Sequence, residues 1–195
     1  VARRMSKLKL HRPVKPGGTL KSVTITQEPD GKRYYSILME YPKPQAATQP
    51  VIQNGIGLDY SMPNLYVDSN GNSPAFPTLY RTMEPKLARA QRKLSRKKPG
   101  SKRYEKQRMK AAKLYAKSKH QRKDVLHKLS CTLTDTYDLI AIEDLDMSAM
   151  KQTLRFGKAV SDNGWGTFVS MLTYKAERKG KLLVKVDRWF PSSKT

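Results

Sequence analysis

The sequence has few cysteines, few acidic residues and no long apolar run. A single cysteine, Cys131, excludes a framework of disulfides and any zinc site built only from cysteines of this chain. We expect Cys131 to be a small core residue in a reducing compartment. The absence of an apolar run near about eighteen residues, and of a signal-peptide pattern at the start, predicts a soluble protein rather than a membrane protein.

Acidic residues are far outnumbered by basic ones. The 195 residues include 39 Lys and Arg against 16 Asp and Glu, which gives a formal net charge of +23. An excess this large predicts a polyanionic partner, and nucleic acid is the commonest one. A membrane surface is the alternative partner. The length suits one domain, or one domain with a small appendage.

The first part of the chain is basic and β-patterned. Two segments of alternating polarity flank Pro29-Asp30-Gly31, which is typical of a hairpin turn because glycine adopts positive φ readily. Residues 42–50 contain three prolines and no periodicity, which indicates a linker. We therefore expect strands of a small β-barrel and a linker over residues 1–50, and a second domain over residues 51–195.

Two carboxylates follow apolar runs in the second part. Residues 54–61 and 64–69, followed by an Asn-Gly turn, predict a β-hairpin with Asp59 on its inner strand. Residues 137–143 contain four consecutive apolar residues before Glu143, which is typical of a strand buried on both faces. On neighbouring central strands, the two acids would form an oxygen-ligand site for divalent cations.

Each carboxylate also has a purely structural interpretation. Asp59 could end a strand and start a turn, and Glu143 could belong to the acidic first turn of a segment beginning at Asp144. The choice between these interpretations depends on the rest of the chain.

A basic segment separates the two carboxylates. From Lys86 to Lys123 there are seventeen Lys or Arg residues and one acid, Glu105, with a turn over residues 98–101. Apolar residues at helical spacing favour two folded helices that contact phosphates over a disordered basic tail. The residues that we expect to bind nucleic acid are Arg89, Arg92, Lys93, Arg96, Lys97, Lys102, Arg103, Arg108, Lys110, Arg122 and Lys123.

The order of the remaining elements suggests a fold class. A third short extended run is expected over residues 75–79, and an irregular loop over residues 146–162 could cover the site. A helix is then expected from near Asp162 to a C-cap at Gly180, before a last strand over residues 181–187. The apolar side of that helix is expected to contain Trp165, Phe168, Val169, Leu172 and residues 174–176. This order is typical of an α/β, ribonuclease H-like fold, in which acids on central strands hold two metal ions.

Several motifs, in the same order along the chain, resemble a known family. They cover nearly the whole chain and consist of Gly55-Ile-Gly-Leu-Asp59 and residues 121–130, 140–145, 165–168, 174–177 and 186–195. With these motifs the chain resembles the transposon-encoded TnpB (OrfB) family, which is related to the compact type V CRISPR nucleases. Residues 17–41 resemble the closing strands of the wedge barrel of that family.

The resemblance implies an RNA-guided DNA endonuclease. It implies a RuvC domain of the ribonuclease H-like fold with a basic helical insertion, preceded by wedge-barrel strands. Asp59 and Glu143 match two of three catalytic acids, which would hold two Mg²⁺ ions for phosphodiester hydrolysis. The implied partners are a guide RNA and a target DNA, since guide pairing reads sequence in such systems. The implied location is the prokaryotic cytoplasm, at the nucleoid when the protein is on DNA.

The chain also departs from the family pattern. Gly57-Leu-Asp-Tyr-Ser61 keeps the acid but has Ser61 where the family usually has glycine. The zinc ribbon, with its Zn²⁺, and the third acid are expected beyond residue 195, and Asp187 does not match that acid. We therefore expect the chain alone to bind nucleic acid without cutting it. The alternatives are a guide RNA-directed DNA-binding protein or repressor without cleavage and, less well supported, a ribosomal-type RNA-binding protein.

Overall fold

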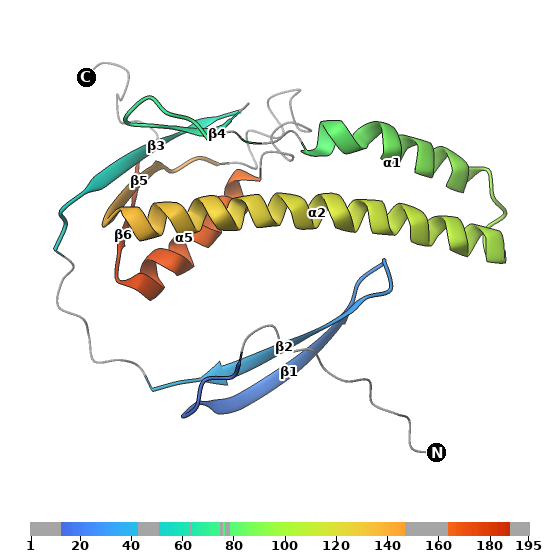
Figure 1. Ribbon diagram of the computed structural model, residues 1–195, viewed down its shortest axis with the longest axis horizontal. Helices are drawn as coiled ribbons and strands as arrows, with labels where there is room; N and C mark the ends of the chain where they lie inside the picture. The colour runs from blue at the N-terminus through green and yellow to red at the C-terminus, as the bar shows by residue number, and fades with distance from the viewer. Residues whose placement is uncertain are drawn as a thin grey trace. The chain divides into compact units, whose positions relative to one another are not determined.

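The computed structural model describes residues 13–42, 51–62, 64–74, 76, 79–146 and 164–187 (Figure 1). The described residues form a mixed α/β structure, and the chain divides into two compact units, Val1–Ala46 and Ala47–Thr195. Nearly all of the linker and the loop expected from the sequence lies outside the described residues, as does Asp162.

The first unit contains an antiparallel hairpin of β1 (Thr19–Gln27) and β2 (Arg33–Glu40). Its turn has the predicted chemistry: Gly31 has a φ of 85°, and the backbone N–H of Lys32 donates to Asp30 Oδ1 at 3.0 Å. The predicted hairpin and its turn are therefore confirmed.

The β1–β2 hairpin has one apolar face. A register shift between Leu20 and Ser22, a β-bulge, places Leu20 opposite Met39 and on the same face as the other apolar side chains. Two strands alone do not build a core, and Leu20 and Ile25 remain 57% and 63% exposed. The apolar face consists of Leu20, Val23, Ile25, Tyr35, Ile37 and Met39.

The second unit is built on a four-stranded sheet of order β4-β3-β5-β6. The inner strands β3 (Gly55–Ser61) and β5 (Leu139–Glu143) are parallel, and β6 (Leu182–Val186) runs parallel to β5. The edge strand β4 (Leu65–Asp68) pairs antiparallel with β3, as the hairpin pattern predicts. The predicted third extended run after this hairpin is wrong where the structure describes it, because Phe76 is not in a strand and α1 begins at Leu79.

Within the part of the chain that the structure describes, three long helices accompany the sheet: α1 (Leu79–Ser95), α2 (Lys102–Thr136) and α5 (Trp165–Lys179). Ser101 caps α2 by accepting a hydrogen bond from the Tyr104 backbone N–H at 3.1 Å, so the predicted turn between the basic helices is confirmed. Gly180 ends α5 in the left-handed conformation, as the sequence predicts. In Figure 1, α1 and the N-terminal half of α2 extend beyond the sheet.

The core lies between one face of the sheet and the helices α2 and α5. Phe168 is fully buried and stacks on Tyr66 of β4, with ring centroids 5.6 Å apart. The ring centroids of Trp165 and Phe168 are 5.7 Å apart. The buried cluster consists of Ile56, Leu58, Leu65, Tyr66, Leu126, Leu133, Ile140, Ile142, Trp165, Phe168, Met171 and Leu172.

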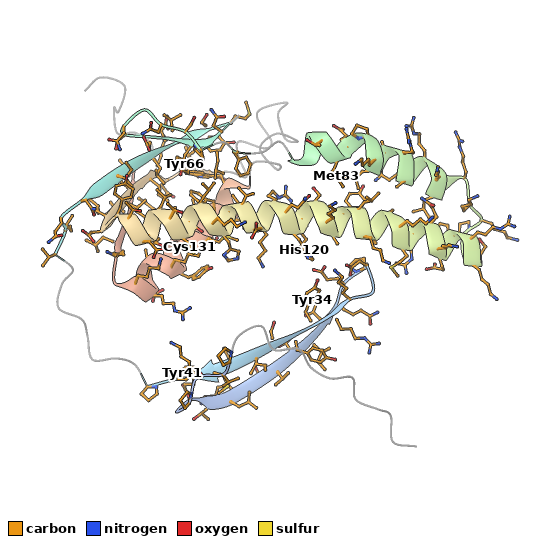
Figure 2. The ribbon with its side chains drawn as sticks, viewed as in Figure 1. Tyr34, Tyr41, Tyr66, Met83, His120 and Cys131 are labelled. Atoms are coloured by element: carbon orange, nitrogen blue, oxygen red, sulfur yellow. The ribbon has the colours of Figure 1, made fainter. Side chains whose placement is uncertain are left out.

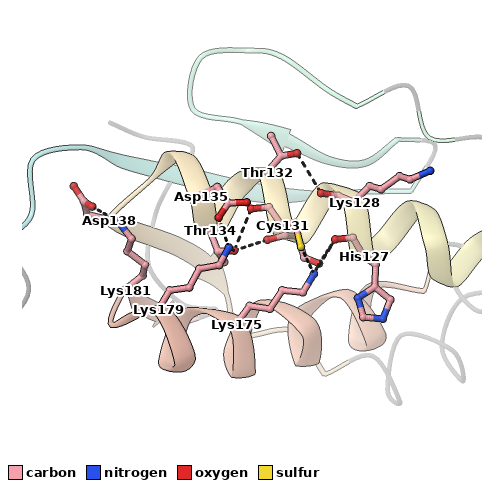
Figure 3. Close-up of polar contacts among 11 residues, drawn as sticks. His127, Lys128, Cys131, Thr132, Thr134, Asp135, Asp138, Lys175, Lys179 and Lys181 are labelled. Carbon is pink, nitrogen blue, oxygen red and sulfur yellow. Dashed lines mark hydrogen bonds and ion pairs between the residues drawn. The ribbon is translucent and has the colours of Figure 1, made fainter. Parts of the chain in front are cut away.

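Two predicted core residues are exposed. Tyr174 of α5 is 45% exposed because helical spacing places it almost half a turn from Trp165, Phe168 and Leu172. Cys131 of α2, labelled in Figure 2, is exposed as well. The group buried between these helices is the Lys175 amine (Figure 3), which donates to His127 O at 2.8 Å and lies 3.1 Å from Cys131 Sγ.

The predicted burial of β5 on both faces is only partly confirmed. Ile140 and Ile142 are buried against the helices, whereas Leu139 and Ala141 on the other face are half-buried. No helix of the described residues packs on that second face.

The starts of three strands meet at Asp138. Its Oδ2 accepts the backbone N–H of Gln53 at 3.1 Å and of Asn54 at 3.3 Å, immediately before β3. Its Oδ1 accepts Lys181 Nζ at 2.6 Å, immediately before β6 (Figure 3). The hydrogen bond from Lys181, followed by the one from the Gln53 backbone, lowers the pKa of Asp138.

We predict a pH-dependent loss of stability from this carboxylate. Because the pKa of Asp138 is lower in the folded state than the unfolded value of about 3.9, ionised Asp138 stabilises the fold above that value. This contribution disappears as the pH falls through the folded pKa. Urea unfolding at a series of pH values should show that the free energy of unfolding falls more steeply on acidification for the wild type than for Asp138→Asn. Parallel stability curves for the two proteins would contradict the prediction.

Candidate functional site

Asp59 and Glu143 occupy equivalent positions on adjacent strands. The parallel pairing of β3 with β5 matches Leu58 with Ile142, and Asp59 and Glu143 are the next residues on the two strands. Neighbouring strands are about 4.8 Å apart, and residues in register on parallel strands point to the same face. The structure thus brings the two predicted site residues side by side, at the carboxyl ends of inner strands.

Both side chains lie on the face of the sheet opposite the core. Side chains alternate along a strand, and Ile56 and Leu58 of β3 are buried against the helices, as are Ile140 and Ile142 of β5. Asp59 is accordingly exposed and Glu143 is half-buried. The backbone holds the two acids in place, while their oxygens remain accessible.

The two acids differ from other acids of the sheet in having no partner. Asp68 accepts backbone N–H groups in the turn after β4, Asp138 binds Lys181, and Asp144 pairs with Lys185 at 3.1 Å. The carboxylates of Asp59 and Glu143 make neither a hydrogen bond nor an ion pair with any residue that the structure describes. The structure thus gives these two carboxylates no role in holding the fold together.

The pair has the donor chemistry of a hard-cation site. Two carboxylates suit Mg²⁺, which commonly takes one or two protein carboxylates and keeps several waters. Among the described residues, no three His, Cys, Asp or Glu side chains gather as a metal site. The residues therefore fit a partial Mg²⁺ site that needs further ligands from elsewhere.

The predicted nucleic-acid-binding residues fall on the helical pair α1–α2. Arg89, Arg92 and Lys93 lie on α1, while Arg96 and Lys97 lie in the turn that follows it. These and most of the α2 residues are exposed. Arg122 is half-buried, and Arg108 Nε pairs with Glu105 at 2.7 Å, which partly neutralises it. The α2 residues are Lys102, Arg103, Arg108, Lys110, Arg122 and Lys123.

Three exposed lysines of α2 that are not named among the predicted binding residues lie in line with two that are. Lys106, Lys113 and Lys117 lie on the same side of the helix as Lys102 and Lys110. Their spacing of three or four residues is visible in the sequence once one continuous helix is assumed.

No helix within the described residues combines the length and hydropathy needed to cross a membrane.

The described residues form a mixed α/β structure with a pair of strongly basic helices and two carboxylates that have no partner among those residues. Residues 35–154 match the family model OrfB_IS605, described as a probable transposase, and residues 165–195 match the Cas12f1-like TNB domain. The chain therefore belongs to the transposon-encoded OrfB (TnpB) family.

The relatives are longer proteins. A protein of Streptomyces pristinaespiralis named "Putative RNA-guided DNA endonuclease" is 36% identical over 94% of this chain and 45% of its own length. InsQ of Escherichia coli (strain K12), which carries the same name, is 28% identical over 91% of this chain and 47% of its own length. The chain thus spans about half the length of these relatives.

Proposed function

We propose that the chain is the part of an RNA-guided DNA endonuclease that carries two acids of a RuvC-type, ribonuclease H-like site. The observation that carries this proposal is the in-register position of Asp59 and Glu143, which have no partner among the described residues. The names of the relatives supply the activity class and the partners, a guide RNA and a target DNA. The one-sided apolar face of the β1–β2 hairpin supports its assignment to a wedge barrel, where other strands would cover that face.

In the proposed reaction, Asp59 and Glu143 are the residues that would hold Mg²⁺. Bound Mg²⁺ supplies Lewis-acid stabilisation of a phosphodiester displacement, and two ions are expected in the complete site. The strands fix the two carboxylates, so little reorganisation is needed when the phosphate arrives. The basic residues of α1 and α2 neutralise phosphates of the bound nucleic acid and do not read its bases.

A guide RNA-directed DNA-binding protein without cleavage is the second candidate function. The observation that favours it is that no third acid joins Asp59 and Glu143 among the described residues. Such a protein would keep the basic helices and lose the need for the two carboxylates.

A chimaera distinguishes the two functions. Residues 51–195 would replace the matching segment of the relative from Streptomyces pristinaespiralis, so that the rest of that protein supplies the remaining elements. With guide RNA and Mg²⁺, we expect this chimaera to cut target DNA and its Asp59→Ala form to bind the target without cutting. A well-folded chimaera that binds the target but never cuts would favour the DNA-binding protein.

A further inference from the structure

One side of α2 carries five lysines in line, which we call the lysine row. Their spacing of four, four, three and four residues places them on one side of the helix, and all are exposed. At a rise of about 1.5 Å per residue, the row extends about 22 Å along the helix. The row consists of Lys102, Lys106, Lys110, Lys113 and Lys117.

The row points away from the contact between α1 and α2. Gln107 Nε2 donates to Ala90 O of α1 at 3.1 Å, and Ala111 and Ser118 are buried on the same side of α2. Each of these three residues directly follows a lysine of the row. One residue corresponds to about 100° around a helix, so the row lies on a side of α2 that α1 leaves open.

The positive charge of the row is not compensated within the structure. None of its lysine ammonium groups makes a hydrogen bond or ion pair with a described residue. The acid nearest to them on the helix, Glu105, lies off the row and pairs with Arg108. Further along α2 the pattern changes, because Lys128 pairs with Asp124 at 2.7 Å. Like charges three and four residues apart repel one another, so an anion lying along the row would relieve that repulsion.

The composition of the row fits phosphates and not bases. Lysine offers a compact point charge, whereas bidentate recognition of guanine typically uses arginine and base stacking uses aromatic rings. No Phe, Trp or Tyr residue of α2 lies on the side of the row, and one exposed arginine, Arg103, lies at its edge, about 20° from Lys110 around the helix. A nucleic acid on this side of α2 is therefore held by its backbone, with its bases directed away from the helix.

The straightness of the row indicates the form of the nucleic acid. A strand of a duplex winds once around its axis in about 34 to 36 Å, so over the length of the row it turns through roughly two-thirds of a turn and leaves the line. A single strand can follow the line from end to end.

We propose that the lysine row holds a single nucleic-acid strand by successive phosphates and leaves its bases exposed to solvent. This inference rests on the proposed nucleic-acid-binding function and specifies the surface and the form of the partner. Backbone contacts alone do not detect the ribose 2′-hydroxyl, so the row should treat RNA and DNA strands alike.

The test compares two triple variants of the full 195-residue chain. Lys106→Gln/Lys110→Gln/Lys113→Gln alters the row. Lys15→Gln/Arg33→Gln/Arg178→Gln is the matched control, because it removes the same charge from exposed positions outside α1 and α2. Binding of labelled oligo-uridine, oligo-thymidine and a duplex of equal length would be followed by fluorescence anisotropy over a range of salt concentrations, with circular dichroism as the check on folding.

The row variant should reduce the slope of log affinity against log salt for both single strands by about 2, since each phosphate contact contributes about 0.7. The control variant should keep the wild-type slope for single strands. Equal losses in both variants would overturn the proposal, because the effect would then follow net charge alone. A wild-type chain that binds no nucleic acid would overturn the proposed function as well.

A second measurement tests the direction of the bases. A carbodiimide reagent that modifies the N3 position of unpaired uridine and thymidine should react with a strand bound to the wild-type chain as fast as with the free strand. Protection of the bases in the bound strand would overturn the proposal, because it would show that the bases face α2.

Discussion

Asp59→Asn is expected to abolish specific divalent-cation binding by the 195-residue chain, and Glu143→Gln is expected to do the same. Each substitution leaves a single carboxylate at an exposed position, and without substrate phosphates as further ligands it competes poorly with the water shell of the ion. Mn²⁺ also prefers oxygen ligands in octahedral geometry, so titration followed by electron paramagnetic resonance measures the site directly.

Asp144→Asn provides the matched control for this titration. Asp144 directly follows Glu143, but its carboxylate is already paired with Lys185 at 3.1 Å. The control should therefore bind Mn²⁺ as the wild type does. An Asp59→Asn protein that gives the wild-type titration would show that the two carboxylates do not share an ion.

Phe168→Ala is expected to destabilise the second unit by about 3 to 5 kcal/mol, the usual cost of truncating a buried phenylalanine. Phe168 has no exposed surface and contacts both Tyr66 of β4 and Trp165 of α5. The substitution leaves a cavity between the sheet and α5 that its rigid neighbours fill only in part.

Chemical denaturation followed by tryptophan fluorescence measures this loss, since Trp165 lies next to the substituted residue. Thr173→Ala on the exposed side of α5 is the control, because it removes only a local hydrogen bond to Val169 O. A Phe168→Ala loss no larger than that of the control would mean that the ring contributes little to the core.

Local sequence signals predict the elements of this chain well. Pro29-Asp30-Gly31 predicts the first hairpin, and Gly180 predicts the end of α5, because both depend on conformations that glycine favours. The apolar runs before Asp59 and Glu143 predict the two inner strands. These signals are carried by a few adjacent residues, which is why they can be identified without the fold.

Tertiary relationships are less accessible from the sequence. The register that matches Asp59 with Glu143 is set by a connection of more than eighty residues, and no local pattern determines it. Burial also depends on the partner surface: of two neighbours that the sequence places on the apolar side, Tyr174 is exposed, while Lys175 is buried with its amine next to Cys131. The lysine row likewise becomes visible only when α2 is known to be one unbroken helix.

The unbroken length of α2 has a mechanical consequence. Lys117 at the end of the lysine row and Leu126 in the core are nine residues apart on the same helix, which corresponds to about 13 Å. The length of the helix therefore fixes the distance between the sheet and a nucleic-acid strand bound to the row. It also sets an angular phase, because one inserted residue between these points would rotate the row by about 100° relative to the carboxylate pair. Only insertions of whole helical turns would preserve both the direction of the row and the packing of the core.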